Sequence, residues 1–272
     1  MRLVLLSFGL ICCLASCSLN NVEERTDLNK FFTDQQVVGV FGLFDNGQGS
    51  FIVSDKHRFR DSAWLPASTF KIVNSLIGLE TGTVKDDSTV IKWDGVVRPM
   101  AEWNQDLSMY RAFRLSAVPW YQELARRIGQ PVMQHWIDTL GYGKGYGKTK
   151  IDKIDTFWLD NSFKVSPDEQ LGLVKRLYFS QLPFQHRTQE IVCDMMLMED
   201  NANYKLAYKT GWGRAENGSS IAWIIGWVEE NKHPYFFVQQ FTSTDPKLDI
   251  PAVRLALLKK NLSSLGFLEG KR

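Results

Sequence analysis

Apolar residues along the chain follow first a strand period, then a helical period, and then a strand period again. Two β-rich runs flank Asp45-Asn46-Gly47, which is a strong hairpin signal. After a loop, Pro66-Ala67-Ser68 opens an apolar run with helical spacing, and Gly82 closes it. From about 83 to 205 the spacing is mostly helical. Three β-branched and aromatic runs follow, and a last amphipathic helix is predicted over about 250–265.

This order predicts an α/β (α+β) fold with a central antiparallel sheet flanked by helices. Short turns join consecutive strands, so the sheet is expected to be largely antiparallel. Both ends of the chain contribute to one sheet-based unit, and the helical region of about 83–205 is inserted into it. The sequence has no internal repeat and no inter-domain linker, so 31–272 is predicted to be a single domain. The polar, charged residues 18–30 are predicted to be a tether.

The first 17 residues differ in character from the rest. One Arg precedes an apolar run that is too short to span a membrane, and this is typical of a secretory signal. Leu14-Ala15-Ser16-Cys17 resembles the bacterial lipobox, in which the chain is cut before the Cys and that Cys is lipidated. The prediction is therefore an exported, periplasmic protein held on a membrane surface by a lipid on Cys17. The alternative is an ordinary secretory signal.

Composition excludes several other classes of protein. The 272 residues are 44% apolar and 23% charged, as in globular proteins. A net charge of +2 gives no electrostatic footprint for nucleic acid. The four Cys and four His form no CxxC, HxH or HExxH pattern, so no metal site is expected.

The segment Ser68-Thr69-Phe70-Lys71 begins the first apolar helix and carries a candidate nucleophile. Ser68 and Lys71 are three residues apart, so they share one helix face. A serine is a poor nucleophile unless a base takes its proton. The sequence signals no Ser-His-Asp triad, and a Lys buried among apolar groups loses its proton easily. Lys71 or a derivative of it is therefore the candidate base. The alternative is a capping Ser followed by a solvated Lys.

Two further motifs sharpen this prediction. Lys209-Thr210-Gly211 lies in a predicted strand and is the only KTG in the sequence. Ser116-Ala117-Val118 lies between the other two motifs, about 50 residues after SxxK. A second SxV at residues 88–90 shows that this triplet alone carries little weight. The order and spacing of the three motifs carry the signal, and they match the pattern shared by β-lactamases and penicillin-binding proteins.

Within that pattern the chain resembles class D (oxacillinase-type) serine β-lactamases. The resemblance rests on STFK, SAV, Tyr142-Gly143, Phe157-Trp158-Leu159, KTGW and Arg254, and it covers nearly all of the mature chain. It implies a β-lactamase/transpeptidase-like fold and hydrolysis of the β-lactam ring of penicillins and related antibiotics through an acyl-serine. Lys144 stands where the family usually has Asn, which changes the local hydrogen bonding but not the nucleophile.

The resemblance also implies the role of each site residue. Lys71 would be carboxylated on its side-chain nitrogen by carbon dioxide and act as general base, with no other cofactor. Trp158 would hold the carbamate, and the backbone N–H groups of Ser68 and Trp212 would form the oxyanion hole. The remaining implied residues are a proton relay and its support (Ser116, Lys209), substrate-binding residues (Thr210, Gly211, Arg254) and pocket walls (Val118, Leu159).

The run GYGKGYGKT at 141–149 suggests a phosphate-binding loop but does not fit one. Tyr142 occupies the position where the motif needs Gly, and the run follows a predicted helix and not a strand. No nucleotide is therefore expected, and the segment is predicted to be a mobile, basic surface loop.

Three other functions remain open on the sequence alone. A β-lactam sensor domain or a penicillin-binding protein would be acylated without turnover. A cell-wall transpeptidase or carboxypeptidase would use the same motifs, although such proteins often carry added domains. A silent lipoprotein that only retains the fold is the third. Site chemistry, and not the fold, separates these functions.

Overall fold

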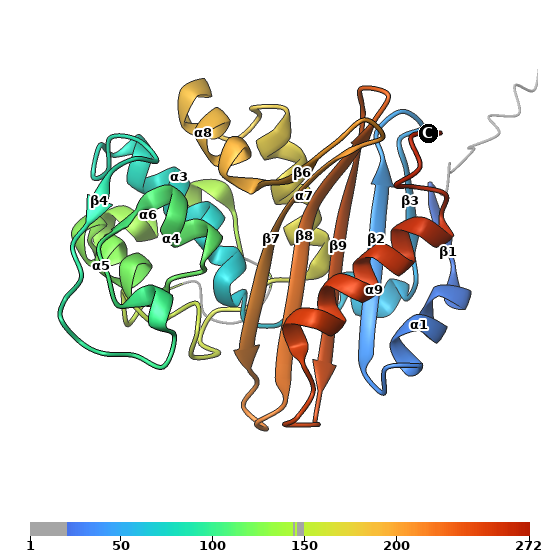
Figure 1. Cartoon of the computed structure of the whole chain (residues 1–272), viewed down its shortest axis with the longest axis horizontal. Helices are drawn as coiled ribbons and strands as arrows, with labels where there is room; N and C mark the ends of the chain where they lie inside the picture. Colours follow the sequence, from blue (N-terminus) through green and yellow to red (C-terminus); the bar gives the residue numbers. More distant parts are fainter. Residues whose placement is uncertain (1–20, 144, 146–149) are drawn as a thin grey trace, which may run out of the picture.

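A seven-stranded sheet forms the centre of the computed structural model, which describes residues 21–143, 145 and 150–272 (Figure 1). The strands lie in the order β1-β3-β2-β9-β8-β7-β6, and every neighbouring pair is antiparallel except β1 with β3. The strands are β1 (Val22–Glu24), β2 (Val38–Asp45), β3 (Ser50–Val53), β6 (Leu197–Asp200), β7 (Lys205–Arg214), β8 (Ser220–Glu230) and β9 (His233–Ser243). The predicted antiparallel sheet is confirmed.

The hairpin between β2 and β3 forms where the sequence predicts it. The Asp45 side chain accepts hydrogen bonds from the backbone N–H groups of Gly47 (2.8 Å) and Gln48 (3.0 Å), which fixes the turn. Gly49 closes it with a φ of 65°, in the left-handed region that glycine tolerates best. Aspartate and glycine at these positions therefore set the register of the two strands.

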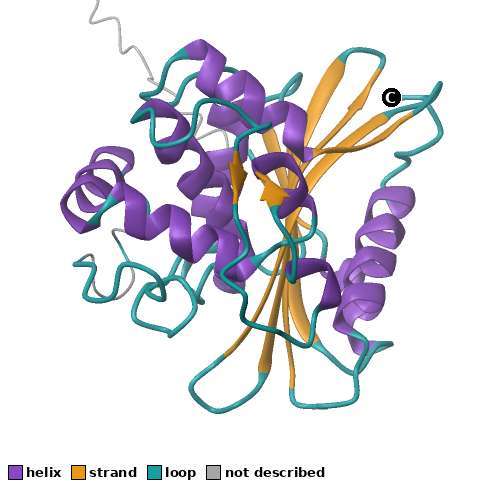
Figure 2. Ribbon diagram, turned by 60° about the vertical axis from the view of Figure 1, so that its left-hand side comes forward, coloured by secondary structure: helices purple, strands orange, loops and turns teal. Residues whose placement is uncertain are grey.

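Helices cover both faces of the sheet (Figure 2). On one face α1 (Asn29–Thr33) and α9 (Ile250–Ser264) enclose a core that includes Phe41, Phe237 and Leu258. The larger core lies on the other face, beneath α2 (Lys56–Arg60) and the inserted helical region. Strand β8 is buried along nearly its whole length because both faces are covered.

The predicted helical insertion is present. Helix α3 (Lys71–Glu80) precedes it. The insertion contains β4 (Val90–Ile91), η3 (Ala101–Trp103), β5 (Leu107–Ser108), α4 (Met109–Arg114), α5 (Val118–Ile128), α6 (Gln130–Leu140), α7 (Pro167–Tyr178) and α8 (His186–Met196). The short β4–β5 ribbon was not predicted, because each strand has only two residues. Within the described ranges, no helix combines the length and apolarity that crossing a membrane requires.

The prediction of a tether over residues 18–30 is wrong for the part that the structure describes. Strand β1 pairs with β3, η1 (Thr26–Leu28) follows, and Leu28 is buried. The Asn29 side chain donates a hydrogen bond to the Ser54 carbonyl at 2.9 Å. Edge pairing uses the backbone, so polar side chains do not prevent it, and one buried leucine anchors the segment. The described part of this segment, from Asn21 onward, is therefore attached to the sheet. Cys17, Lys144 and residues 146–149 of the predicted loop lie outside the described residues.

Gly226, in the centre of β8, supplies a test of how tightly the sheet is packed. A Cβ there would lie 1.9 Å from the Ala207 carbonyl oxygen on β7, so Gly226→Ala should destabilise the protein by about 3 kcal/mol or prevent folding. Gly172 is the matched control, because nothing lies within 4 Å of its added Cβ. Gly172→Ala should stabilise helix α7 by about 0.5–1 kcal/mol. Thermal unfolding of both variants measures this, and equal melting temperatures would contradict it.

Candidate active site

The candidate nucleophile lies in a tight turn that leads into α3. Residues Ala67–Phe70 form the 3₁₀ turn η2, and the α-helix begins only at Lys71. The sequence predicted an α-helix from Pro66-Ala67-Ser68, so its start is later than expected. Ala67 has a φ of 48°, which is unusual for a residue with a side chain, and its N–H donates to the Trp158 carbonyl at 3.0 Å. This bond ties the turn to the Trp158 segment.

Ser68 and Lys71 form a buried pair, as the motif predicted. Lys71 Nζ donates to Ser68 Oγ at 2.8 Å, and Lys71 is only 1% exposed. Burial lowers the pKa of the Lys71 amine to about 7, because the charged form loses its hydration. At neutral pH a large fraction of Lys71 is therefore uncharged, and an uncharged amine can take a proton.

A second serine and lysine pair lies beside the first. Ser116 occupies the turn between α4 and α5 with a φ of 52°, and Lys209 Nζ donates to its Oγ at 2.6 Å. Lys209 Nζ also donates to the Thr210 carbonyl at 3.1 Å. Burial, and then the positive charges of Lys71, Arg254 and Arg114, hold the pKa of Lys209 well below its usual value. The structure thus joins the helical region to strand β7 through this pair.

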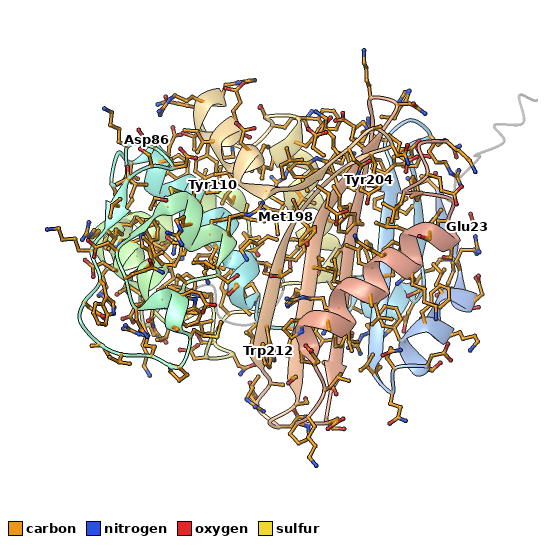
Figure 3. All side chains as sticks on the ribbon, viewed as in Figure 1. Glu23, Asp86, Tyr110, Met198, Tyr204 and Trp212 are labelled. Carbon is orange, nitrogen blue, oxygen red and sulfur yellow. The ribbon has the colours of Figure 1, made fainter. Side chains whose placement is uncertain are left out.

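Strand β7 passes directly along the nucleophile turn. A Cβ on Gly211 would lie 2.9 Å from the Pro66 carbonyl oxygen and 3.2 Å from Thr69 Cγ2, so only glycine permits this approach. Strand β6 pairs with β7 only over residues 205–207, and no other strand of the described residues pairs with that edge of β7 further along. Trp212 follows Gly211 on this edge, and its side chain is 50% exposed on the lower half of β7 (Figure 3).

Arg254 on α9 reaches the same strand. It is only 9% exposed, and its Nη1 donates to the Gly211 carbonyl at 2.7 Å. Burial lowers its pKa to about 10, so it stays a cation at neutral pH. No carboxylate of the described chain contributes to the pKa of Lys71, Lys209 or Arg254. Arg254 therefore supplies a positive charge beside β7, which suits an anionic substrate.

Trp158 is fully buried, and its ring stacks on Phe70 with centroids 5.2 Å apart. Its indole Nε1–H is one of the few buried polar groups in the described residues with no hydrogen-bond partner. A buried donor without a partner is costly and calls for an explanation. Leu159 is half-buried next to it in sequence, and Val118 begins α5 two residues after Ser116. Their role as pocket walls stays a prediction.

The motif analysis missed two residues of this site. Gln170 on α7 is buried and donates to Thr69, the residue after Ser68. Arg114 on α4 is one of the cations that lower the pKa of Lys209. Neither belongs to a short motif, and a Gln or Arg on a helix gives no signal until the fold places it near the turn. In the described chain, no three Asp, Glu, His or Cys side chains are grouped so that they could hold a metal.

The comparisons with known proteins agree on one family. Residues 29–252 match the penicillin-binding protein transpeptidase domain. The chain is 37% identical over 241 residues to β-lactamase OXA-48 of Klebsiella pneumoniae, covering 88% of each protein. It is 35% identical over 267 residues to β-lactamase OXA-11 of Pseudomonas aeruginosa, covering 97% of this chain and 98% of that one. The chain belongs to the class D β-lactamase family.

A solved class D β-lactamase, YbXI from Nostoc, shares the fold. It aligns with a TM-score of 0.82 at 36% identity, over 89% of this chain and 99% of that one. The class D enzyme of Sebaldella termitidis aligns with a TM-score of 0.84 at 31% identity, over 91% and 98%. The predicted family, fold class and enzyme class are thus confirmed: the chain is a β-lactamase, a hydrolase of the cyclic amide bond.

The close approach of β7 to the nucleophile turn generates a prediction for this class D β-lactamase. Gly211→Ala should push β7 away from Pro66 and lower kcat/KM about 100-fold, because catalytic geometry tolerates little displacement. Steady-state hydrolysis of a chromogenic β-lactam measures the change, with Gly172→Ala as the control that keeps its activity. A wild-type kcat/KM in Gly211→Ala would show that the site does not depend on this contact.

Proposed function

We propose that this β-lactamase opens the ring by acylation of Ser68 and then hydrolyses the acyl-serine, with a carboxylated Lys71 as general base. The observation that carries this proposal is the buried Lys71 Nζ, 2.8 Å from Ser68 Oγ. Lys71 is therefore the group placed to take the Ser68 proton. Penicillins and related antibiotics are the proposed substrates, and antibiotic resistance is the proposed outcome.

The residues around Lys71 fit a carbamate. Carbon dioxide reacts with an uncharged amine, and burial lowers the pKa of Lys71 to about 7. The unpartnered Nε1–H of Trp158 would donate to the carbamate and explain an otherwise unsatisfied buried group. When present, the carbamate supplies an anionic base next to Ser68. Bicarbonate or carbon dioxide is therefore the only cofactor that we propose.

Acylation uses the other residues in turn. Ser68 Oγ loses its proton towards the Lys71 side chain and attacks the β-lactam carbonyl carbon. The backbone N–H groups of Ser68 and Trp212 would stabilise the oxyanion, and such donors are typically worth about 3 kcal/mol each. The C–N bond of the ring then breaks. Ser116, hydrogen-bonded to Lys209, would deliver a proton to the departing nitrogen.

Substrate binding and deacylation complete the cycle. Thr210, Gly211 and Arg254 would hold the substrate carboxylate, for which the paired N–H donors of a guanidinium are well suited. Water then attacks the acyl carbonyl and releases Ser68. Trp158 holds the base in place for this step, and Val118 and Leu159 would control the entry of that water. A sensor domain or a penicillin-binding protein would perform the first half of the cycle and stop.

A time course on a chromogenic β-lactam tests the proposal. We expect many turnovers per protein molecule, and more with added bicarbonate. Below pH 7 the Lys71 amine becomes protonated and cannot be carboxylated, so activity should fall and bicarbonate should restore part of it. Trp158→Phe keeps the ring stacking but loses the N–H, and it should accumulate acyl-enzyme after a burst. One stoichiometric burst by the wild type, without turnover, would instead indicate the sensor or penicillin-binding alternative.

We also propose that the protein is exported and anchored to a bacterial membrane through a lipid on Cys17. The support is the sequence alone: a short apolar signal that ends in Leu14-Ala15-Ser16-Cys17. Cells that express the full chain should incorporate labelled palmitate into it, and Cys17→Ser should abolish the label. Labelling at Cys12 or Cys13, or none in the wild type, would contradict lipidation at Cys17.

A further inference from the structure

Two segments that are far apart in the sequence meet at two points on either side of Ser68. The backbones of Trp64 and Val165 form an antiparallel bridge of two hydrogen bonds, at 3.0 and 2.9 Å. Five residues further along each segment, Gln170 Nε2 donates to Thr69 Oγ1 at 2.7 Å. The segments are thus joined at both ends, and Ser68 lies within the joined stretch.

Both the oxygen and the nitrogen of the Gln170 amide form hydrogen bonds. Its Oε1 accepts from the Tyr142 hydroxyl at 2.9 Å, and its Nε2 donates to Thr69. Thr69 Oγ1 in turn donates to the Pro66 carbonyl at 2.7 Å. The three bonds therefore form one chain, in which Tyr142 donates to Gln170, Gln170 to Thr69 and Thr69 to Pro66. Pro66 is two residues before Ser68. Burial raises the pKa of Tyr142 well above its usual value, so this hydroxyl stays protonated and remains a donor.

Gln170 itself is held firmly. It lies in the first turn of α7, where Ser166 Oγ accepts from the Glu169 N–H (3.1 Å) and Glu169 Oε2 accepts from the Ser166 N–H (2.9 Å). Glu169 Oε1 also accepts from the Gly143 N–H at 3.1 Å, so the loop that carries Tyr142 is fixed to the same helix end. The start of α7 is therefore a rigid support for the amide.

The stability of the fold does not by itself explain why residue 170 carries an amide. Gln170 has no solvent exposure, and an apolar side chain of similar size could fill the same space without buried polar atoms. The neighbouring turn, however, holds Ala67 in the left-handed region, and such strain persists only where surrounding contacts maintain it. Removing one of these contacts lets the turn relax.

We propose that Gln170 is a positioning residue for the hydrolytic reaction. Through Thr69 it fixes the turn that presents Ser68 Oγ and the Ser68 N–H, although it touches neither group. The doublet Tyr142-Gly143 acts as the far end of the same network: Tyr142 orients the amide, and Gly143 fixes the loop. This inference rests on the proposed acylation of Ser68.

The experiment is a double-mutant cycle on the acylation rate constant, followed by mass spectrometry in single turnovers. Gln170→Leu and Thr69→Val each remove one partner while keeping the approximate shape. Each should slow acylation about 10- to 100-fold, and the double variant should be no slower than the slower single one. The dissociation constant of the unreacted substrate should change less than twofold, because Thr210 and Arg254 are untouched.

Two further variants separate positioning from folding. Thr69→Ser keeps the hydroxyl and should retain the acylation rate within about threefold. Gln189→Leu removes another buried amide, on α8, which bonds the backbone of Leu182 and Phe184 in the loop before that helix. It should lower the melting temperature without slowing acylation. Should Gln170→Leu fail to fold, Thr69→Val compared with Thr69→Ser still decides the question.

Wild-type acylation in Gln170→Leu and Thr69→Val, or additive effects in the double variant, would overturn the inference. An equal loss of acylation in Gln189→Leu would do the same, because the effect would then be general destabilisation. A wild-type protein that is not acylated on Ser68 would instead overturn the proposed function, so the two failures are distinguishable.

Discussion

The desolvation of Lys71 is the constraint on which the rest of the site depends. A lysine ammonium group in water keeps its proton at neutral pH because its pKa is well above 7. Enclosure by apolar side chains removes the hydration of the charged form and lowers that pKa. That enclosure requires the two halves of the molecule to close around the amine: α3 and the helical region on one side, and strand β7 on the other. Folding and reactivity are thus coupled, because a looser interface would admit water and return Lys71 to its ordinary state.

The same closure brings three basic side chains together. Lys71, Lys209 and Arg254 are all buried, and no carboxylate of the described chain raises the pKa of any of them, so burial lowers all three pKa values. In the mechanism that we propose, the substrate carboxylate and a carbamate on Lys71 would supply the missing negative charge. Substrate binding would then also stabilise the fold.

Much of this could be predicted from the sequence, for local reasons. The Asp45 hairpin, the apolar period of α3 and the β-branched runs of β7 to β9 each depend on neighbours in the chain. The paired motif residues also met as expected, since Ser68 and Lys71 are only three residues apart. What was missed depends on contacts across the sequence. Strand β1 forms through backbone pairing with β3, and Gln170 meets Thr69 across 101 residues. Neither contact produces a signal in the hydrophobic and polar pattern of the neighbouring sequence.

The position of β1 has a consequence for the geometry of the protein at a membrane. Val22 is only five residues after Cys17, and five extended residues span at most about 18 Å. A lipid on Cys17 would therefore hold the β1 edge of the sheet against the bilayer surface. Strand β7 is five strand spacings away, or about 24 Å. With the proposed lipid, the molecule would stand on the β1 edge of its sheet, and the site residues on β7 would lie about 24 Å from that edge.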